Sequence, residues 1–456
     1  MGAAEERIRQ LFDEGTSRLM DDLTPTIHWL GEGRVDGRRV YACAGVPEAG
    51  RVDILECFHR KVAWLERVLA DPAPVVWLHD APPQAPGGRT PIPANSDELL
   101  ASGAGVGRAF CLQARLNERA PQISASFGDL GAAQTFPLRL ADFVLLKRGS
   151  HAWIGRPDAV KLMLGAAPDA ERLGGAEMHC TVSGVGDGLF ERDEEALDWI
   201  RACLGCLPSR AGEVPPVAGA KEPEGTPEEM AAAIPTDLNK PFEMKRVLRG
   251  IIDAGSWVEV QALYAREALT GFARVGGDPV GVLANNSSAR GGVIFPETCR
   301  KMERFIRYCD QWGLPMVFLA DNPGLMVGED SERSGMLRAA ADLVRALASC
   351  CAPRICFVAR KAYTVGLYAM SGPGFEPARF WAAPGASISV FGPKALDRFA
   401  QDRDLPEAAR EAIREMHHHA VEPRDYEDKG YLDGVIEWAD IRGRLEEFLR
   451  ETAAER

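Results

Sequence analysis

The pattern of hydrophobic positions is most informative in the second half of the chain. Residues 315–320 form a short apolar run that ends in a polar Asp-Asn-Pro-Gly sequence, and helical spacing follows over 336–349. A second apolar run covers 354–359, a polar break follows at 360–366, and a helix is expected from Leu367 onward. A strand that turns tightly into a helix leaves free backbone N–H groups. Such groups can bind a developing oxyanion or a phosphate.

The same pattern occurs earlier in the chain. Three segments of the first half match segments about 230 to 240 residues later, in the same order. The matched pairs are 34–40 with 274–280, 74–80 with 315–321, and 120–127 with 352–359. A single match between short apolar runs can arise by chance, whereas three at a nearly constant offset indicate a duplicated domain. The pattern therefore predicts an α/β protein with two copies of one domain.

A stretch of low apolar content separates the two copies. Residues 211–235 contain two adjacent prolines, Pro215 and Pro216, followed by a run rich in Ala, Gly and Glu. We expect an irregular linker in this stretch. The predicted N-terminal domain then covers 1–210, and the predicted C-terminal domain covers 236–456.

Charge and composition restrict the partners. The 456 residues carry a formal net charge of −13, which argues against binding to nucleic acid or to an anionic membrane. No apolar run reaches the ~18–20 residues that a membrane span needs, and the first residues lack a signal-peptide pattern. We therefore expect a cytoplasmic protein. Its 11 cysteines are expected to be reduced and packed, and their spacing predicts no metal site.

Further segments resemble one known family. Residues 173–176 and 181–185 are similar to its "LGGA…H…SGV" segment, residues 154–160 to one of its turns, and residues 431–436 to a segment near its end. Together with the duplicated loops, they resemble the carboxyltransferase (β) subunits of biotin-dependent acyl-CoA carboxylases, such as those for propionyl- and methylcrotonyl-CoA. The resemblance implies an α/β fold with two tandem crotonase-like (ClpP/crotonase) domains related by internal duplication.

The resemblance also implies a reaction, in which carboxylate moves between carboxybiotin and the α-carbon of an acyl-CoA through an enolate. The thioester oxygen and the ureido oxygen of biotin both gain negative charge, so two sets of N–H donors are needed. By position, the first set falls on Ala132 and Ala133, and the second on Val365 and Gly366. Sequence position does not tell which set serves which anion. The change Gly366→Pro deletes one donor, whereas Gly366→Ala keeps the N–H group and is expected to be milder if φ is negative there.

The implied partners follow from the same resemblance. The substrate is a coenzyme A thioester, and biotin is carried on a separate biotin carboxyl carrier protein that a biotin carboxylase subunit loads. The active site of this family forms between the first half of one subunit and the second half of another. We therefore expect a homo-oligomer, either a dimer of active-site halves or a hexamer.

Polar residues at the loop ends are the candidates for ligand binding. Those expected to contact the cofactor flank the second loop: Arg360, Lys361, Tyr363 and Thr364. Arg290, together with Arg360 and Lys361, is a candidate for the CoA phosphates. Asp129 and Tyr368 are expected in the substrate pocket because Asp129 lies in the first loop and Tyr368 occupies a position near the acyl group in related subunits.

The chain also departs from the family pattern. Alanine stands at 132 and 133, and Thr-Val at 364 and 365, where glycine pairs are usual. Each added Cβ is expected to narrow the site and to exclude a positive φ. Asp129 stands where proline is common, and a carboxylate beside an oxyanion site is unfavourable unless it is neutral, turned away or used in proton transfer. An exposed turn aspartate is the simpler interpretation.

These departures leave three hypotheses open. The first is a biotin-dependent acyl-CoA carboxyltransferase subunit. The second is an acyl-CoA decarboxylase of the malonyl or methylmalonyl type on the same fold, which can act without biotin. The third is a non-catalytic assembly subunit that keeps the fold for packing. Acyl-CoA binding separates the third hypothesis from the first two.

Overall fold

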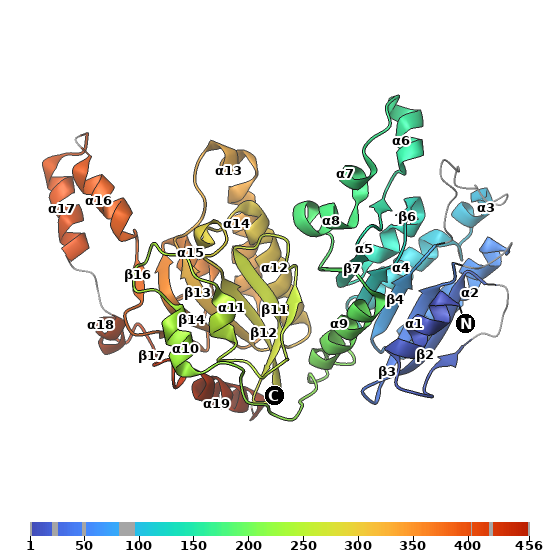
Figure 1. Ribbon diagram of the computed structural model, residues 1–456, viewed down its shortest axis with the longest axis horizontal. Coiled ribbons are helices and arrows are strands. Elements are labelled where there is room, and N and C mark those ends of the chain that lie inside the picture. Colours follow the sequence, from blue (N-terminus) through green and yellow to red (C-terminus); the bar gives the residue numbers. More distant parts are fainter. Residues whose placement is uncertain are drawn as a thin grey trace. The chain divides into compact units, whose positions relative to one another are not determined.

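The protein consists of two compact units, Met1–Pro216 and Val217–Arg456, which we describe one at a time (Figure 1). The computed structural model describes residues 2–20, 26–47, 52–81, 96–402, 404–418 and 423–454. Among these residues, no helix is long and apolar enough to cross a membrane.

Unit 1 is built on a 7-stranded sheet with the strand order β1-β2-β3-β4-β5-β7-β9. The strands are β1 (Arg18–Leu19), β2 (His28–Val35), β3 (Arg38–Gly45), β4 (Val75–His79), β5 (Gln122–Ser126), β7 (Phe143–Lys147) and β9 (Gly188–Phe190). The first two pairings are antiparallel and the others are parallel. A separate parallel pair, β6 (Leu130–Gly131) and β8 (Ala152–Trp153), joins the loops that follow β5 and β7.

Unit 1 also contains helices, of which α6 buries no residue. They are α1 (Ala3–Leu11), α2 (Ile54–Ala70), α3 (Ser96–Ala101), α4 (Val106–Leu116), α5 (Phe136–Leu140), α6 (Pro157–Leu164), α7 (Ala170–Gly174), α8 (Ala176–Met178) and α9 (Asp193–Cys206), with the short helices η1 (Ala132–Gln134) and η2 (His179–Ser183). Helix α2 begins where the Asp53 carboxylate accepts the N–H groups of Leu55 and Glu56. Its buried face packs Trp64 edge-on against Trp77 of β4.

Unit 2 repeats the architecture. Its sheet has the order β10-β11-β12-β13-β14-β15-β17, again with two antiparallel pairings followed by parallel ones. The strands are β10 (Val258–Val260), β11 (Ala268–Val275), β12 (Asp278–Asn285), β13 (Met316–Asn322), β14 (Arg354–Tyr363), β15 (Arg379–Ala382), β16 (Ser387–Ser389) and β17 (Gly434–Val435). Strand β16 pairs with β14 off the main path. The predicted duplicated α/β fold is therefore confirmed.

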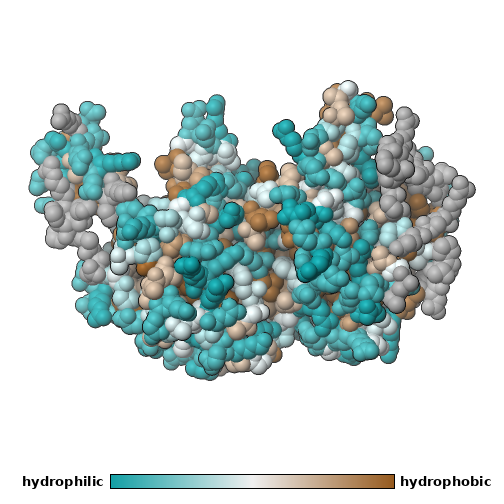
Figure 2. Space-filling view, in the orientation of Figure 1, coloured by the Kyte–Doolittle hydropathy of each residue, from teal (hydrophilic) through white to brown (hydrophobic). Residues whose placement is uncertain are grey.

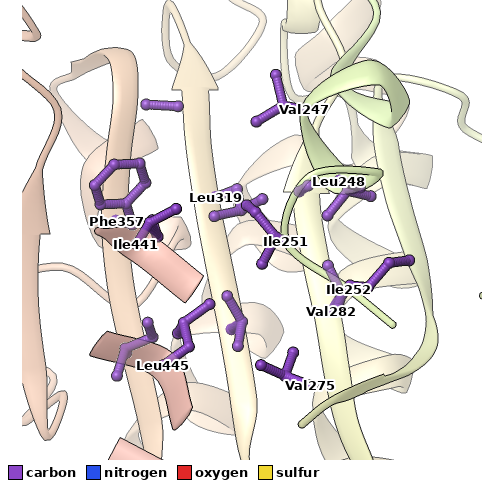
Figure 3. Packing of buried hydrophobic residues seen from close by; sticks show 14 of the residues in the cluster. Val247, Leu248, Ile251, Ile252, Val275, Val282, Leu319, Phe357, Ile441 and Leu445 are labelled. Carbon is purple, nitrogen blue, oxygen red and sulfur yellow. The ribbon is translucent and has the colours of Figure 1, made fainter. Parts of the chain in front are cut away.

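Unit 2 also contains helices, of which the first two and the last supply buried residues to one large apolar core. They are α10 (Pro227–Ala233), α11 (Met244–Leu248), α12 (Pro296–Gln311), α13 (Glu329–Arg333), α14 (Met336–Ser349), α15 (Val365–Ala369), α16 (Pro393–Gln401), α17 (Glu407–His418), α18 (Pro423–Asp428) and α19 (Ile441–Ala454), with η3 (Arg290–Gly292). Ile441 and Leu445 of α19 pack with Leu319 and Phe357 of the central strands (Figure 3). Burial of these side chains stabilises the unit.

Both units anchor their first hairpin in the same way. In unit 1 the Asp13 carboxylate accepts the N–H groups of Asp36 and Gly37 at 3.1 and 2.8 Å, and it pairs with Arg201 of α9 at 3.0 Å. The matching residues of unit 2 are Asp253, Gly276, Gly277 and Arg442 of α19. The repeat thus extends from strand order to individual polar contacts.

Two local predictions differ from the structure. Strand β14 continues through Tyr363, because Ala362 pairs with β13 and Lys361 with β16, so the break predicted over 360–366 is wrong. The turn is confined to Thr364, and α15 begins at Val365 rather than at Leu367. The stretch 211–235 contains α10, and its residue Ala218 donates an N–H to Gly277 O within unit 2.

Candidate active site

Each unit contains a strand-turn-helix loop with the same backbone geometry. Ala132 follows β6 with a φ of 51°, and Thr364 follows β14 with a φ of 49°. The carbonyl oxygen of each accepts the N–H group three residues further on, from Thr135 at 3.1 Å and from Leu367 at 3.2 Å. The two loops therefore correspond residue by residue, with Ala132 in the place of Thr364.

The expectation that a Cβ excludes a positive φ is wrong at both positions. Thr364 also has a ψ of −135°, a backbone conformation that costs a β-branched residue free energy. Its N–H donates to Ser389 O at 3.1 Å and its hydroxyl to Tyr363 O at 2.8 Å. These contacts, with α15 on the other side, hold the residue in the strained conformation. Strain of this kind is frequent at functional sites.

We expect Thr364→Gly to raise the free energy of unfolding by about 1 kcal/mol. Glycine adopts this φ without steric cost, and this relief of strain exceeds the cost of the greater conformational entropy that glycine gives to the unfolded chain. Chemical denaturation measures the change. Thr135→Gly is the matched control in the other loop and should destabilise, since Thr135 has a φ of −79° and its hydroxyl bonds Trp153 O. An equal loss of stability in both variants would contradict strain at Thr364.

The N–H groups at the start of the two short helices are free to meet a ligand. The first N–H groups of a helix have no acceptor within it. In the described part of the chain, no other acceptor takes the N–H groups of Ala133, Gln134, Val365 and Gly366. Because Val365 and Gly366 correspond to Ala133 and Gln134, the structure adds Gln134 to the candidate donors of unit 1. The donor roles of Ala132, Ala133, Val365 and Gly366 stay predictions.

Gly366 is fixed by a close neighbour. A Cβ on Gly366 would lie 1.8 Å from Oδ1 of Asn322, at the end of β13. The buried Asn322 amide cannot easily move away, because its Oδ1 accepts the Gly324 N–H at 3.1 Å and its Nδ2 donates to Asn285 Oδ1 at 2.9 Å. The expectation for Gly366→Ala considered φ alone and did not include this clash with Asn322. That Gly366→Ala is milder than Gly366→Pro stays a prediction.

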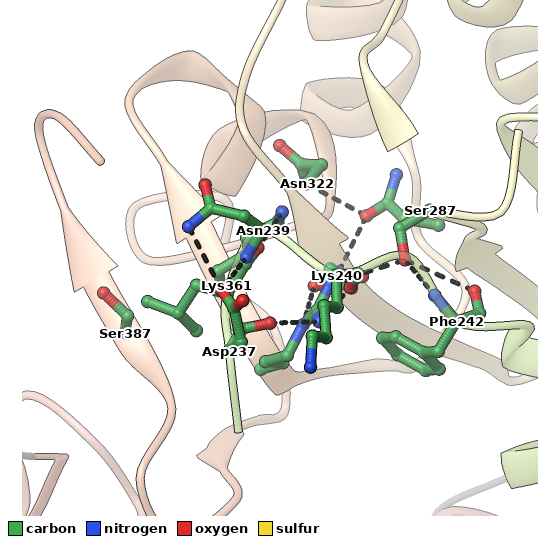
Figure 4. Close-up of polar contacts among 12 residues, drawn as sticks. Asp237, Asn239, Lys240, Phe242, Ser287, Asn322, Lys361 and Ser387 are labelled. Carbon is green, nitrogen blue, oxygen red and sulfur yellow. Dashed lines mark hydrogen bonds and ion pairs between the residues drawn. The ribbon is translucent and has the colours of Figure 1, made fainter. Parts of the chain in front are cut away.

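Arg360 and Lys361 bind groups of the protein itself. Arg360 is buried and pairs with both Asp321 oxygens, each at 3.0 Å. Lys361 Nζ donates to Leu238 O at 2.8 Å, and burial lowers the pKa of this amine. The two side chains hold the segment 237–242 against the end of β14 (Figure 4). The assignment of these residues to a cofactor stays a prediction.

The other candidates lie around the same loop or nearby in unit 2. Tyr363 is buried, and its hydroxyl lies 3.2 Å from Ser387 Oγ. Tyr368 is 45% exposed on α15, with its ring next to Phe375. Arg290 pairs with Glu267 and Glu297. Each of the three cations proposed for CoA phosphates thus has an acceptor within the protein.

Asp129 is turned toward His151, a residue that the sequence analysis did not select. Its Oδ1 lies 2.8 Å from His151 Nδ1 and accepts the His151 backbone N–H at 3.1 Å. His151 Nε2 lies 3.0 Å from Glu171 Oε1, and the ring stacks on Trp153. The hydrogen bond between the Asp129 carboxylate and the His151 ring lowers the pKa of Asp129 and raises the pKa of His151. Asp129 is therefore an exposed but paired turn residue.

This pair predicts a defined pH dependence. His151 has a raised pKa, so its contribution is complete below the unfolded value of about 6.5 and is lost as pH rises through the folded value. Asp129 has a lowered pKa, so its contribution is complete above about 3.9 and is lost as pH falls. The unfolding free-energy difference between wild type and Asp129→Asn should therefore be largest between about pH 4 and 6.5. Denaturation across pH measures it, and a constant difference would contradict the pairing.

An apolar pocket of about 620 Å³ lies beside the first loop. It is lined by Thr135, Phe136, Leu138, Arg139, Leu140, Ala152, Trp153, Ile154, Gly155, Val160, Leu173, His179 and Val185. Leu162, Met163 and Leu164 at the end of α6 are exposed, and Figure 2 shows hydrophobic side chains at the top of this unit. A pocket of this size and composition suits a small organic ligand. Within the described ranges, no three His, Cys, Asp or Glu side chains are grouped as metal ligands.

Comparison with known proteins identifies the family. Residues 30–456 match the family described as "Carboxyl transferase domain", so the chain belongs to this family of carboxyltransferases. It is 32% identical over 477 residues to the propionyl-CoA carboxylase, carboxyltransferase subunit, of Haloferax mediterranei, covering 99% of this chain and 90% of the relative. It is 30% identical over 473 residues to the methylmalonyl-CoA decarboxylase subunit alpha of Veillonella parvula, with the same coverage of 99% and 90%.

A solved structure gives the same result for the fold. Transcarboxylase 12S, described as a hexamer with methylmalonyl-coenzyme A and methylmalonic acid bound, superimposes with a TM-score of 0.87 at 27% identity. The superposition covers 99% of this chain and 90% of the other. The predicted fold of two crotonase-like domains and the predicted family are both confirmed.

Proposed function

We propose that the protein is the carboxyltransferase subunit of an acyl-CoA carboxylase, which moves carboxylate between carboxybiotin and the α-carbon of an acyl-CoA. The observation that carries the proposal is the pair of matching loops, each with two N–H groups that have no acceptor among the described residues. The reaction creates two anions, an enolate on the thioester and a charged ureido oxygen on biotin. Preorganised N–H donors stabilise such anions by about 2.7–4 kcal/mol per donor.

The two loops have different surroundings, which suggests a division of roles. The loop of unit 1 adjoins the apolar pocket, where Phe136, Trp153 and Ile154 offer a surface for the acyl and pantetheine groups. We assign the acyl-CoA enolate to Ala133 and Gln134, and the biotin oxygen to Val365 and Gly366. Biotin then arrives on a separate carrier protein that a biotin carboxylase loads.

Assembly of several copies fits the exposed apolar surface of unit 1. The side chains of Leu162, Met163 and Leu164 are exposed on one short helix, α6. Large exposed apolar groups in this arrangement are typical of protein interfaces. We propose that another copy of the chain covers them, so that unit 1 of one copy and unit 2 of another complete the site. Light scattering at micromolar concentration tests this, and a monomer would contradict it.

Decarboxylation of a malonyl-type CoA is the second candidate function. It is favoured by the similarity to the methylmalonyl-CoA decarboxylase subunit and by the residues Ala132 and Thr364 in place of the usual glycines. An enolate forms in this reaction too, so the unit 1 loop would keep its role. Only the need for biotin differs.

One experiment separates these functions. Purified protein is incubated with methylmalonyl-CoA carrying a labelled carboxylate, with and without free biotin or a biotinylated carrier domain. Label on biotin supports the carboxyltransferase, whereas CO₂ release that does not need biotin supports the decarboxylase. Absence of acyl-CoA binding would overturn both and leave a non-catalytic assembly subunit.

A further inference from the structure

The first loop is flanked by a cationic side chain, Arg156. This residue lies directly before α6, and its side chain crosses Gly131, the residue before Ala132. A Cβ on Gly131 would lie 2.6 Å from Arg156 Cγ and 3.3 Å from its Nη1. The φ of Gly131 is −143°, an extended conformation that any residue adopts. Glycine at this position therefore provides space for Arg156, which lies directly against the loop.

The guanidinium group of Arg156 lies beside the wall of the apolar pocket. Its central carbon is 5.3 Å from the centre of the Trp153 ring. Trp153, Ile154 and Gly155 all line the pocket, so the residues on the N-terminal side of Arg156 form part of its surface. Arg156 is partly exposed, and among the described residues its guanidinium makes no hydrogen bond and no ion pair. Its N–H groups are therefore available to an acceptor on a ligand.

The nearest negative charge is already bound to another residue. The Asp129 carboxylate contacts the ring and the backbone N–H of His151. The hydrogen bond from His151 lowers the pKa of Asp129 most, and the charge of Arg156 adds a smaller effect. Arg156 thus differs from Arg290 and Arg360, which bind acceptors within the protein.

The position of Arg156 restricts which anion it can meet. Gly131 and Ala133 are two residues apart, so their Cα atoms are separated by at most about 7.6 Å. With the enolate oxygen assigned to Ala133 and Gln134, a group that reaches Arg156 must lie close to the thioester. The α-carboxylate of a malonyl-type acyl-CoA is attached to the carbon next to the thioester carbon. The phosphates of CoA lie at the far end of the pantetheine arm.

We propose that Arg156 binds the α-carboxylate of a malonyl-type acyl-CoA and so selects carboxylated thioesters. The inference rests on the proposed function, which places the enolate oxygen at the first loop. A planar guanidinium can bind both oxygens of a carboxylate. The contact exists before the carboxylate leaves the α-carbon, so it strengthens substrate binding more than it stabilises the enolate. Arg156 is therefore a specificity-determining residue.

The test measures binding of methylmalonyl-CoA and of propionyl-CoA to the full chain by isothermal titration calorimetry. The two thioesters differ only in the α-carboxylate. Arg156→Met keeps an apolar side chain beside Trp153 and should weaken methylmalonyl-CoA binding about tenfold, the loss expected for a hydrogen bond to a charged group. Binding of propionyl-CoA should not change. Arg67→Met, which removes an exposed arginine of α2, is the matched control and should bind both thioesters like wild type.

Two further variants keep the test decisive if Arg156→Met does not fold. Arg156→Lys keeps a positive charge but loses the planar fork, so its loss of methylmalonyl-CoA binding should be smaller. Gly131→Ala keeps the arginine but places a Cβ where the arginine side chain lies, so it should reduce the preference for methylmalonyl-CoA. Added to Arg156→Met, Gly131→Ala should cause no further loss of preference.

The binding data separate failure of this inference from failure of the proposed function. Equal weakening of both thioesters by Arg156→Met would overturn the inference, because a contact with a CoA phosphate or a packing role affects both. Unchanged binding of both thioesters in this variant would overturn it as well. A wild-type protein that binds neither thioester would instead overturn the proposed function, together with the role of Arg156 that rests on it.

Discussion

Val365→Pro is expected to lower kcat by about 10²–10³-fold while the protein stays folded, because the change removes one N–H donor from the second loop. Val365 is the first residue of α15, a position where proline is tolerated. The preceding Thr364 has a ψ of −135°, outside the helical region that a following proline disfavours. Steady-state carboxyl transfer measures kcat, and circular dichroism checks the fold.

Val365→Ala is the matched control, since it shortens the side chain and keeps the N–H. It should retain kcat within a few-fold of wild type. Gly366→Ala does not serve this purpose, because its Cβ would meet Asn322. Full turnover in a folded Val365→Pro variant would show that α15 does not stabilise an anion, and the proposed role of the second loop would fail.

The largest loss of stability is expected from Arg360→Met, which leaves the Asp321 carboxylate buried without its cation. The side chains of Arg360 and Asp321 are 4% and 0% exposed, and breaking a buried ion pair from one side costs about 3–5 kcal/mol. Equilibrium denaturation measures the change. Arg333→Met removes a cation from an exposed pair with Glu329 and should have little measurable effect.

A double variant tests whether the cost comes from the stranded carboxylate. Arg360→Met with Asp321→Leu removes both charges and should be less destabilised than the sum of the two single changes. A loss below about 1 kcal/mol for Arg360→Met alone would mean that the protein relaxes around Asp321 or that water reaches it. Such a result would contradict an unpaired, dry Asp321 carboxylate as the cause of the loss.

The fold was predictable because its signal repeats along the chain. The apolar runs at 75–79 and 316–320 are strands with the same neighbours in each unit, and both follow from local hydrophobic pattern. The end of β14 was not predictable, because Arg360 and Lys361 look like loop residues until their acceptors are known. Arg360 binds Asp321 of β13, and both residues bind main-chain carbonyls in the segment 237–242, more than 100 residues earlier in the chain.

The sequence could predict where in the chain the candidate site lies, but it could not predict which side chains contact one another there. The loops lie where the internal repeat predicts them. The rule that residues with a Cβ avoid a positive φ was wrong here, because Ala132 and Thr364 both adopt one. His151 and Asn322 gave no signal in the sequence. Each is notable only through partners that depend on the folded chain.

The ion pairs of Arg201 with Asp13 and of Arg442 with Asp253 have a further consequence for how this protein can be built. Each joins the last helix of a unit to the segment that precedes the first antiparallel hairpin of its sheet, so an early and a late part of each unit meet in space. Units with adjacent ends tolerate circular permutation and separate expression. A gene split near codon 216 would keep each of these ion pairs within one half. Each half would also carry one of the two strand-turn-helix loops, at Ala132 or at Thr364.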